Sequence, residues 1–206
     1  MSKSWDNKIE IHPYHRFPLE DGGSEYLILG SFPPNKFTNY RERQTDGDVD
    51  FFYGSKDNSF WELFIKAKEL LLKWPNDVEM LKSYLNVNKW MVSDIVQSTI
   101  RKSDSALDRD LQPTNWNIET IEGIFQNNSI RHLLFTSNWV KNNFNKKLKT
   151  HLKSSIDTIK NYTLISPSAA GLISTNWARE ILPKEESESL ETYREKYYKW
   201  VFTQIK

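Results

Sequence analysis

The chain has 206 residues, enough for one hydrophobic core in one domain, and its 28 basic and 27 acidic side chains leave a formal net charge of +1. This balance excludes a strongly basic nucleic-acid binder, so any DNA contact has to come from a local patch. The absence of cysteine excludes disulfides, thiol catalysis, cysteine zinc sites and iron–sulfur clusters. No apolar run reaches the roughly 18 residues of a membrane span. We therefore expect a single domain over residues 1–206, in the cytoplasm and without membrane contact.

Short apolar runs that predict buried strands alternate along the chain with stretches of helical periodicity. In chain order we expect strand Tyr26–Leu29, helix Phe60–Lys73, helix Val78–Leu85, strand Trp90–Val96 (its apolar run broken by Asp94), helix Ile118–Phe125, strand His132–Phe135, helix Trp139–Leu152, strand Tyr162–Ile165 and helix Ser187–Ile205. This alternation is typical of a mainly parallel sheet covered by helices on both faces. Such sheets bind ligands in the loops beyond the carboxyl ends of their strands, and three loops of this kind stand out.

The first loop, Gly30-Ser31-Phe32-Pro33-Pro34, follows the first predicted strand. Gly30 lets the backbone approach a ligand closely, and the prolines fix φ. A turn of this composition, taken alone, is more often an ordinary turn than a binding loop.

The second loop runs from Phe51 to Trp61 and gathers aromatic side chains around Gly54 and a polar cluster, just before a predicted helix. Such a group can form a flat pocket with amide and carboxylate edges. The simpler alternative is that Asn58 only caps the helix, while Phe60 and Trp61 only anchor the core.

The third loop follows the last predicted strand and reads Ser166, Pro167, Ser168, Ala169, Ala170, Gly171 and Leu172. The serine hydroxyls and the backbone amides are suited to holding a phosphate. The small residues at the tip, followed by apolar Leu172, are suited to entering a base stack. An ordinary turn is again the simpler explanation when the loop is taken alone.

Taken together and in this order, the three loops resemble the signature of the uracil-DNA glycosylase superfamily, closest to its branch of hypoxanthine-DNA glycosylase-like and mismatch-specific uracil glycosylase-like proteins. The matching segments are Gly30–Pro33, Tyr53–Trp61 and Ser166–Ser168, with further matches at Met91–Val96, Leu107–Asp108 and Ile130–Ser137. The similarity extends over residues 9–204. It implies an α/β fold, a three-layer α/β/α sandwich with a four-stranded, mainly parallel sheet.

The resemblance also implies a function: a monofunctional, cofactor-free and metal-free glycosylase that acts on DNA, as a monomer, on a base turned out of the stack. Asn58 matches the catalytic position, where it would orient the attacking water, and Asp57 is its rival as a carboxylate beside the pocket. The base pocket would comprise Gly30, Ser31, Phe32 and Tyr53, with Tyr53 as the stacking aromatic. DNA would be held by Pro33, Ser166, Pro167, Ser168, Ala169, Ala170, Gly171 and Leu172, with Leu172 filling the gap left by the base.

Two departures from the family pattern keep alternatives open. Phe32 occupies a position where relatives commonly carry Asp or Asn to orient water, and Ser55-Lys56 replaces the usual His-Pro. The leading hypothesis is excision of a deaminated base, hypoxanthine or uracil. The alternatives are excision of a bulky modified pyrimidine from phage DNA, as a defence enzyme, and a non-catalytic sensor of damaged or single-stranded DNA. His12 and His15 lack the partner spacing of a metal site.

Overall fold

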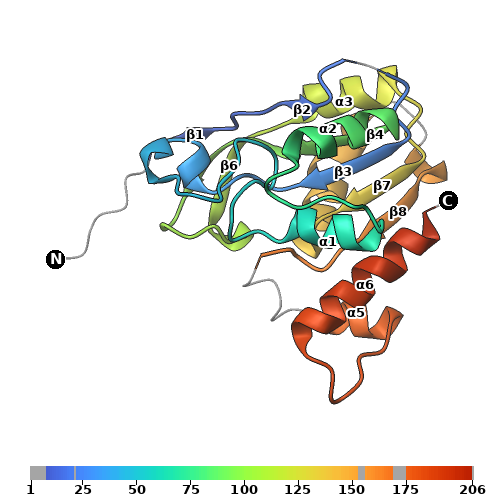
Figure 1. Cartoon of the computed structure of the whole chain (residues 1–206). Helices are drawn as coiled ribbons and strands as arrows, with labels where there is room; N and C mark the ends of the chain where they lie inside the picture. Colours follow the sequence, from blue (N-terminus) through green and yellow to red (C-terminus); the bar gives the residue numbers. More distant parts are fainter. Residues whose placement is uncertain (1–7, 21, 153–155, 169–174, 206) are drawn as a thin grey trace.

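The computed structural model describes residues 8–20, 22–152, 156–168 and 175–205, and its centre is a five-stranded sheet of order β2-β4-β3-β7-β8. The strands in that order are Arg16–Phe17, Trp90–Asp94, Tyr26–Gly30, His132–Phe135 and Lys160–Thr163. Neighbours from β4 to β8 pair in parallel, and β2 pairs antiparallel with β4. Figure 1 shows β3, β7 and β8 running side by side, with α1 and α6 next to each other.

A second, antiparallel sheet of order β1-β5-β6 adjoins the first. Its strands are Glu10–Ile11, Val96–Arg101 and Leu111–Trp116. The prediction of one strand over Trp90–Val96 was therefore wrong, because the chain leaves β4 at Ile95 and enters β5. The backbone N–H groups of Ile95 and Val96 still bond to the carbonyls of Gly30 (2.9 Å) and Ser31 (3.2 Å), so the turn stays attached to the end of β3.

The predicted count of four strands in the sheet was also wrong, since β2 adds a fifth at the edge. The strands β1 and β2 have two residues each. A strand of that length shows no periodicity in the sequence, so only its pairing partner defines it.

Side chains of the parallel strands alternate between two cores, as the pleat of a strand requires. Ile28 packs toward α1 (Phe60–Ala67), α2 (Val78–Val87), α5 (Asn176–Ile181) and α6 (Leu190–Gln204). Leu27 and Leu29 pack toward α3 (Ile118–Asn127) and α4 (Asn138–Asn143). Helices therefore cover both faces of the sheet, and the predicted α/β/α layering agrees with this packing.

Several helical turns are short. The 3-10 turns are Asn35–Phe37, Arg41–Arg43, Asp108–Asp110, Lys149–His151 and Ile156–Thr158, and a π-helical turn spans Phe144–Leu148. The helix predicted over Trp139–Leu152 is thus divided into α4, the π turn and a 3-10 turn. The helix α5 has six residues and was not predicted.

Helix α1 ends at Ala67, although the apolar pattern continues to Leu71. Glu69 adopts a left-handed conformation, with φ of +54°, which ends the helix. The apolar residues beyond it therefore do not belong to the buried face of α1, and the side chain of Leu71 is fully exposed.

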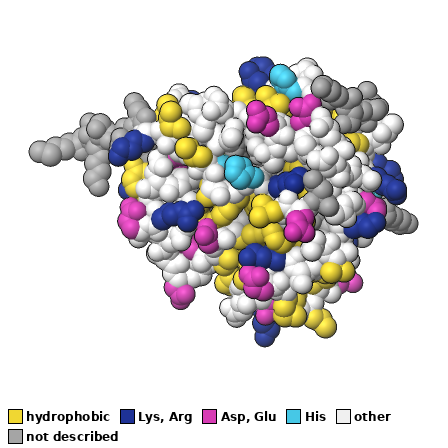
Figure 2. Space-filling model, turned by 90° about the horizontal axis from the view of Figure 1, so that it is seen from above, with side chains coloured by type: hydrophobic (Ala, Val, Ile, Leu, Met, Phe, Trp, Pro, Cys, Tyr) yellow, Lys and Arg dark blue, Asp and Glu magenta, His cyan; other side chains and the backbone are white. Residues whose placement is uncertain are grey.

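Charged side chains of both signs are interspersed on the face shown in Figure 2, with apolar side chains between them. This distribution agrees with the balanced composition of the chain. None of the helices in the described part of the chain is long and apolar enough to cross a membrane.

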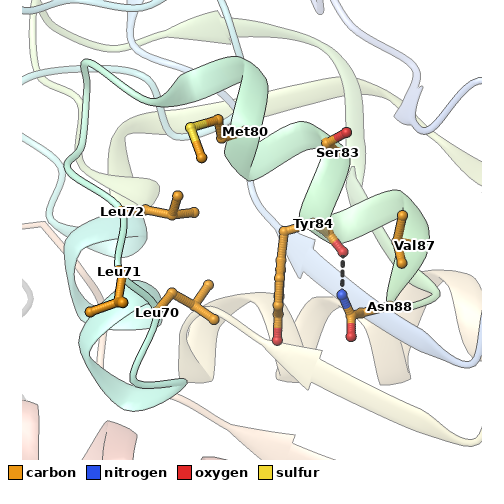
Figure 3. A pocket seen from close by; sticks show the side chains of 8 residues that line it. All are labelled: Leu70, Leu71, Leu72, Met80, Ser83, Tyr84, Val87 and Asn88. Atoms are coloured by element: carbon orange, nitrogen blue, oxygen red, sulfur yellow. Dashed lines mark hydrogen bonds between the residues drawn. The ribbon is translucent and has the colours of Figure 1, made fainter.

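An apolar groove of about 450 Å³ lies between the segment after α1 and helix α2 (Figure 3). It is lined by Leu70, Leu71, Leu72, Met80, Ser83, Tyr84, Val87 and Asn88. No carboxylate, imidazole, amine or guanidinium is among these residues. Their one titratable side chain is Tyr84, whose pKa is raised by burial.

The same substitution, leucine to alanine, should have very different effects on stability at a buried and at an exposed position. Leu134 on β7 is fully buried, whereas Leu71 is fully exposed. We expect Leu134→Ala to lower the free energy of unfolding by about 2–5 kcal/mol, because it leaves a cavity at the centre of the sheet. Leu71→Ala should change it by no more than about 0.5 kcal/mol. Urea denaturation followed by tryptophan fluorescence measures both, and equal losses would contradict this description of the core.

Candidate active site

A cavity of about 490 Å³ opens at the carboxyl ends of the parallel strands, where open α/β sheets bind their ligands. Each of the four strands contributes to its lining. Ser31 follows β3, Asp94 ends β4, Ser137 follows β7 and Ser166 follows β8. Residues from all three predicted loops line this one cavity.

Gly30 ends β3 beside Asp94, its partner in the register with β4. The Tyr53 hydroxyl donates a hydrogen bond to Asp94 Oδ1 (3.2 Å) directly over Gly30. A Cβ atom on Gly30 would lie 2.7 Å from Tyr53 Cε1, and closer still to the Tyr53 hydroxyl and to Asp94 Oδ1. Only glycine therefore fits at this position. Burial, together with the negative charge of Asp94, raises the pKa of Tyr53 well above its usual value, so the hydroxyl remains a donor.

His12 binds the second oxygen of Asp94, through a contact of 2.7 Å between its Nε2 and Asp94 Oδ2. The backbone N–H of Tyr14 donates to His12 Nδ1 (3.0 Å), which fixes the tautomer with the ring proton on Nε2. The side chains of His12 and Asp94 are both buried. Sequence reasoning missed this pair, because its members are 82 residues apart and no local pattern joins them.

The aromatic residues of the second loop are anchored beneath helix α1. Trp61 donates through Nε1 to the Phe52 carbonyl (2.7 Å), and its ring stacks on Phe51 with centroids 5.6 Å apart. Tyr53 is itself held at a φ of +54° and packs against Phe60 with centroids 4.6 Å apart. These contacts hold the loop in place, and Tyr53 lines the cavity.

Asp57 lies at the cavity but is mostly exposed, with 76% of its side-chain surface accessible, and is 3.3 Å from Lys36 Nζ. Lys36 also contacts buried Asp48 (2.7 Å), which accepts hydrogen bonds from the backbone N–H groups of Lys56 and Thr45. Burial of Asp48 acts to raise its pKa, but these hydrogen bonds outweigh it and hold the pKa below the usual value. This geometry favours the reading of Asp57 as a solvated, ion-paired loop charge.

Asn58 lines the cavity and also bonds to the first residue of helix α1. Its Oδ1 accepts a hydrogen bond from the Phe60 N–H (2.9 Å), and its backbone forms an isolated antiparallel bridge with Ser168. Ser59, the N-cap residue, directs its hydroxyl to the Pro167 carbonyl instead (2.8 Å). The start of α1 is thereby attached to the third loop.

The third loop is held from below by helix α6. Arg194, of which 8% is exposed, donates to the carbonyls of Ser166 and Ser168, both at 3.3 Å. Tyr198 donates to the Ile165 carbonyl (2.9 Å). The hydroxyls of the two serines are 3.1 Å apart. The predicted DNA-binding residues Ala169, Ala170, Gly171 and Leu172 lie outside the described residues.

Phe32 is buried and lines the cavity, its ring meeting the His12 ring edge-on at 5.3 Å. The Arg101 guanidinium lies over the Phe32 ring (5.6 Å), donates to the Pro33 carbonyl and pairs with buried Glu10 (3.0 Å). Phe32 is thus a fixed apolar wall of the site and has no group to orient water.

Asp108 is a cavity residue that the sequence marked only as part of the family match Leu107–Asp108. Its carboxylate accepts hydrogen bonds from the hydroxyls of Ser137 (3.1 Å) and Ser31. Burial raises the pKa of Asp108 above its usual value; the two hydrogen bonds oppose this rise, and the charge of Asp94 adds to it. A carboxyl group that takes up a proton more readily than usual therefore faces the cavity.

The described residues contain no group of three or more His, Cys, Asp or Glu side chains that could hold a metal ion. His12 is engaged with Asp94, and the backbone carbonyl of His15 accepts a hydrogen bond from Ser93 Oγ (2.7 Å).

Comparison with known proteins yields a match of fold. No family model matches the sequence, and no curated protein matches it either. Among solved structures, the chain is similar to a solution NMR structure from Methanosarcina acetivorans, named as a "putative Uracil DNA glycosylase". The two share 18% sequence identity with a TM-score of 0.53, and the match covers 96% of this chain and 99% of the other. The chain has a uracil-DNA-glycosylase-like fold. At this identity, the likeness shows the fold alone.

The crowding at Gly30 gives a test that does not depend on function. We expect Gly30→Ala to displace Tyr53 from Asp94 and to lower the free energy of unfolding by about 1–3 kcal/mol. Gly123→Ala in helix α3 is the control, because nothing lies near its added methyl group. It should stabilise the protein by about 0.4–1 kcal/mol. Urea denaturation measures both changes, and near-UV circular dichroism reports the environment of Tyr53. A stable Gly30→Ala variant with native tyrosine signals would contradict the described packing.

Proposed function

We propose that this chain is a monofunctional DNA glycosylase that hydrolyses the N-glycosidic bond of an everted deaminated base, hypoxanthine or uracil, as the hypoxanthine-DNA glycosylase-like branch would. The observation that carries the proposal is convergence. Tyr53, Asn58 and Ser166 are far apart in the sequence and line one cavity, together with Ser31 and Phe32, which directly follow Gly30. The resemblance assigns these residues to the stacking aromatic, the catalytic amide, the DNA loop and the base pocket.

The cavity offers an everted base the contacts that it needs. Tyr53 and Phe32 supply aromatic surface, and stacking on such surface contributes about 1–3 kcal/mol per base. Polar groups at the ends of the strands supply hydrogen bonds to the edges of the base. Ser166 and Ser168 lie beside them in the loop that would hold the flanking phosphates, which position the strand without reading its sequence.

Asn58 is the proposed group that orients the attacking water. One lone pair of its Oδ1 receives the Phe60 N–H, which fixes the plane of the amide and leaves a second lone pair for water. An amide is a poor base, so its contribution is orientation of the water as the sugar becomes cationic. The proton is lost from the water after attack on the anomeric carbon.

The volume of the cavity supports a second candidate, excision of a bulky modified pyrimidine. A site of about 490 Å³ is in the range that holds drug-sized ligands, which are larger than a bare base. Phe32, in the usual water-orienting position, supports the third candidate, a non-catalytic sensor.

A single panel of oligonucleotides separates the three candidates. Duplex and single-stranded DNA carrying hypoxanthine, uracil or glucosylated hydroxymethylcytosine is incubated with the protein and then treated with alkali, which breaks the strand at abasic sites. We expect breaks at hypoxanthine or uracil, and none in matched DNA with ordinary bases. Breaks only at the glucosylated base identify the second candidate. Tight binding without breaks identifies the sensor.

If Asn58 orients the attacking water, its loss should slow excision without weakening the binding of DNA. Asn58→Ala should lower single-turnover excision by about 100-fold or more, while the Kd for DNA changes little. Loss of the hydrogen bond from the Phe60 N–H should also lower the free energy of unfolding by about 1 kcal/mol. Asn86→Ala, on the exposed surface of α2, is the matched control and should leave excision unchanged. Unchanged excision by folded Asn58→Ala protein would refute the assignment.

A further inference from the structure

Asp108 is a half-buried acid for which the proposed mechanism has so far no use. It lines the cavity, yet protein surrounds it on its other sides, and its two hydrogen-bond partners lie at the carboxyl ends of the neighbouring strands β3 and β7. Asn58 contacts the third loop beyond β8 instead. Asp108 therefore faces the part of the cavity that Ser31 and Ser137 line, at the ends of the strands. Asn58 lies instead beside the loop that would hold the DNA backbone.

The negative charge of Asp94 in this part of the cavity would repel a departing base that carries negative charge. Asp94 is buried there, with both oxygens engaged by Tyr53 and His12. A base that leaves with the electron pair of its glycosidic bond carries negative charge, and a second negative charge near a buried carboxylate is unfavourable. A proton delivered to the base as the bond breaks removes this repulsion.

We propose that Asp108 is a catalytic residue, the general acid that protonates the departing base; this inference rests on the proposed glycosylase function. The bond between the anomeric carbon and the base nitrogen breaks, and its electron pair stays on the base. The carboxyl proton of Asp108 passes to the base, which leaves neutral. Water adds to the anomeric carbon and loses a proton, which returns Asp108 to its acid form directly or through solvent.

The groups that face Asp108 raise or lower its pKa. The Ser31 and Ser137 hydroxyls stabilise the carboxylate, Asp94 on β4 favours the acid form, and Arg101 on β5 opposes it. The neighbouring Arg109 has an exposed side chain. Burial prevails among these influences, and the pKa of Asp108 is raised. The active form is the acid, so excision by the wild type should fall as pH rises through this pKa, above pH ~4, the ordinary value for Asp.

The test measures single-turnover excision against pH, on whichever base of the panel the wild type removes. Asp108→Asn cannot donate this proton. It should lose about 100-fold or more in rate at low pH and should lack the falling limb of the profile. Asp110→Asn is the matched control, because Asp110 lies in the same helical turn but outside the cavity lining and bonds to Ser103 (3.1 Å). It should keep the wild-type profile.

A second variant keeps the test valid if Asp108→Asn fails to fold. Ser137→Ala removes a hydrogen bond that stabilises the carboxylate, so the pKa of Asp108 should rise further and the falling limb should move to higher pH. Where uracil is a substrate, 5-fluorouracil provides another readout, because it is a better leaving group that needs less help from an acid. Asp108→Asn should then slow its excision far less than that of uracil.

The outcomes separate the inference from the function. A wild type that excises a base, with an Asp108→Asn variant of unchanged rate and pH profile, overturns the role of Asp108 and leaves the glycosylase standing. An equal loss for uracil and 5-fluorouracil, or an unmoved limb in Ser137→Ala, also overturns it. A wild type that excises none of the bases overturns the proposed function, and this inference with it.

Discussion

The hydrogen bond from the Tyr53 hydroxyl to Asp94, closed over Gly30, is the interaction on which the cavity depends. A buried carboxylate is tolerated only when its oxygens are hydrogen-bonded. Tyr53 engages one oxygen of Asp94 and His12 engages the other. The aromatic loop and the N-terminal segment must therefore both reach the end of β4, or a charge is left unpaired in the core. Because Gly30 has no side chain, the ring and the carboxylate can meet directly above the backbone.

The elements that sequence reasoning placed well are those whose pattern is local. The strand predicted at His132–Phe135 has those bounds, and the strand predicted at Tyr26–Leu29 is longer by one residue. The starts of the helices at Phe60, Val78 and Ile118 also agree, since apolar spacing defines each of them. The second sheet could not be predicted, because it depends on pairing between β1, β5 and β6. Likewise, no local signal shows that an apolar run turns from one sheet into another at Ile95.

The residues of the candidate site also fall into two groups, those that a local sequence pattern identifies and those that it does not. Ser31, Tyr53, Asn58 and Ser166 belong to short motifs whose order was recognisable, and all four line the same cavity. His12, Asp94 and Asp108 owe their surroundings to side chains from distant segments. Their chemistry is a property of burial and of partners, neither of which a residue type or a spacing encodes. For Asn58, the sequence offered two alternatives, a structural role at the start of helix α1 and a place in the pocket. The structure shows both, because its Oδ1 accepts the Phe60 N–H and the residue also lines the cavity.

The buried ion pair of Arg101 and Glu10 shows how a site of this kind is kept rigid without contact with a ligand. Arg101 donates to the carbonyl of Pro33 on one side and to that of Ser105 on the other (3.0 Å), while Glu10 accepts from Thr38 (2.6 Å). Ser105 begins the short segment that leads to Asp108. One guanidinium thus fixes the spacing between the Phe32 wall and the Asp108 segment. A positioned acid is effective only if it stays within hydrogen-bond reach of its target, and this buried network provides that constraint.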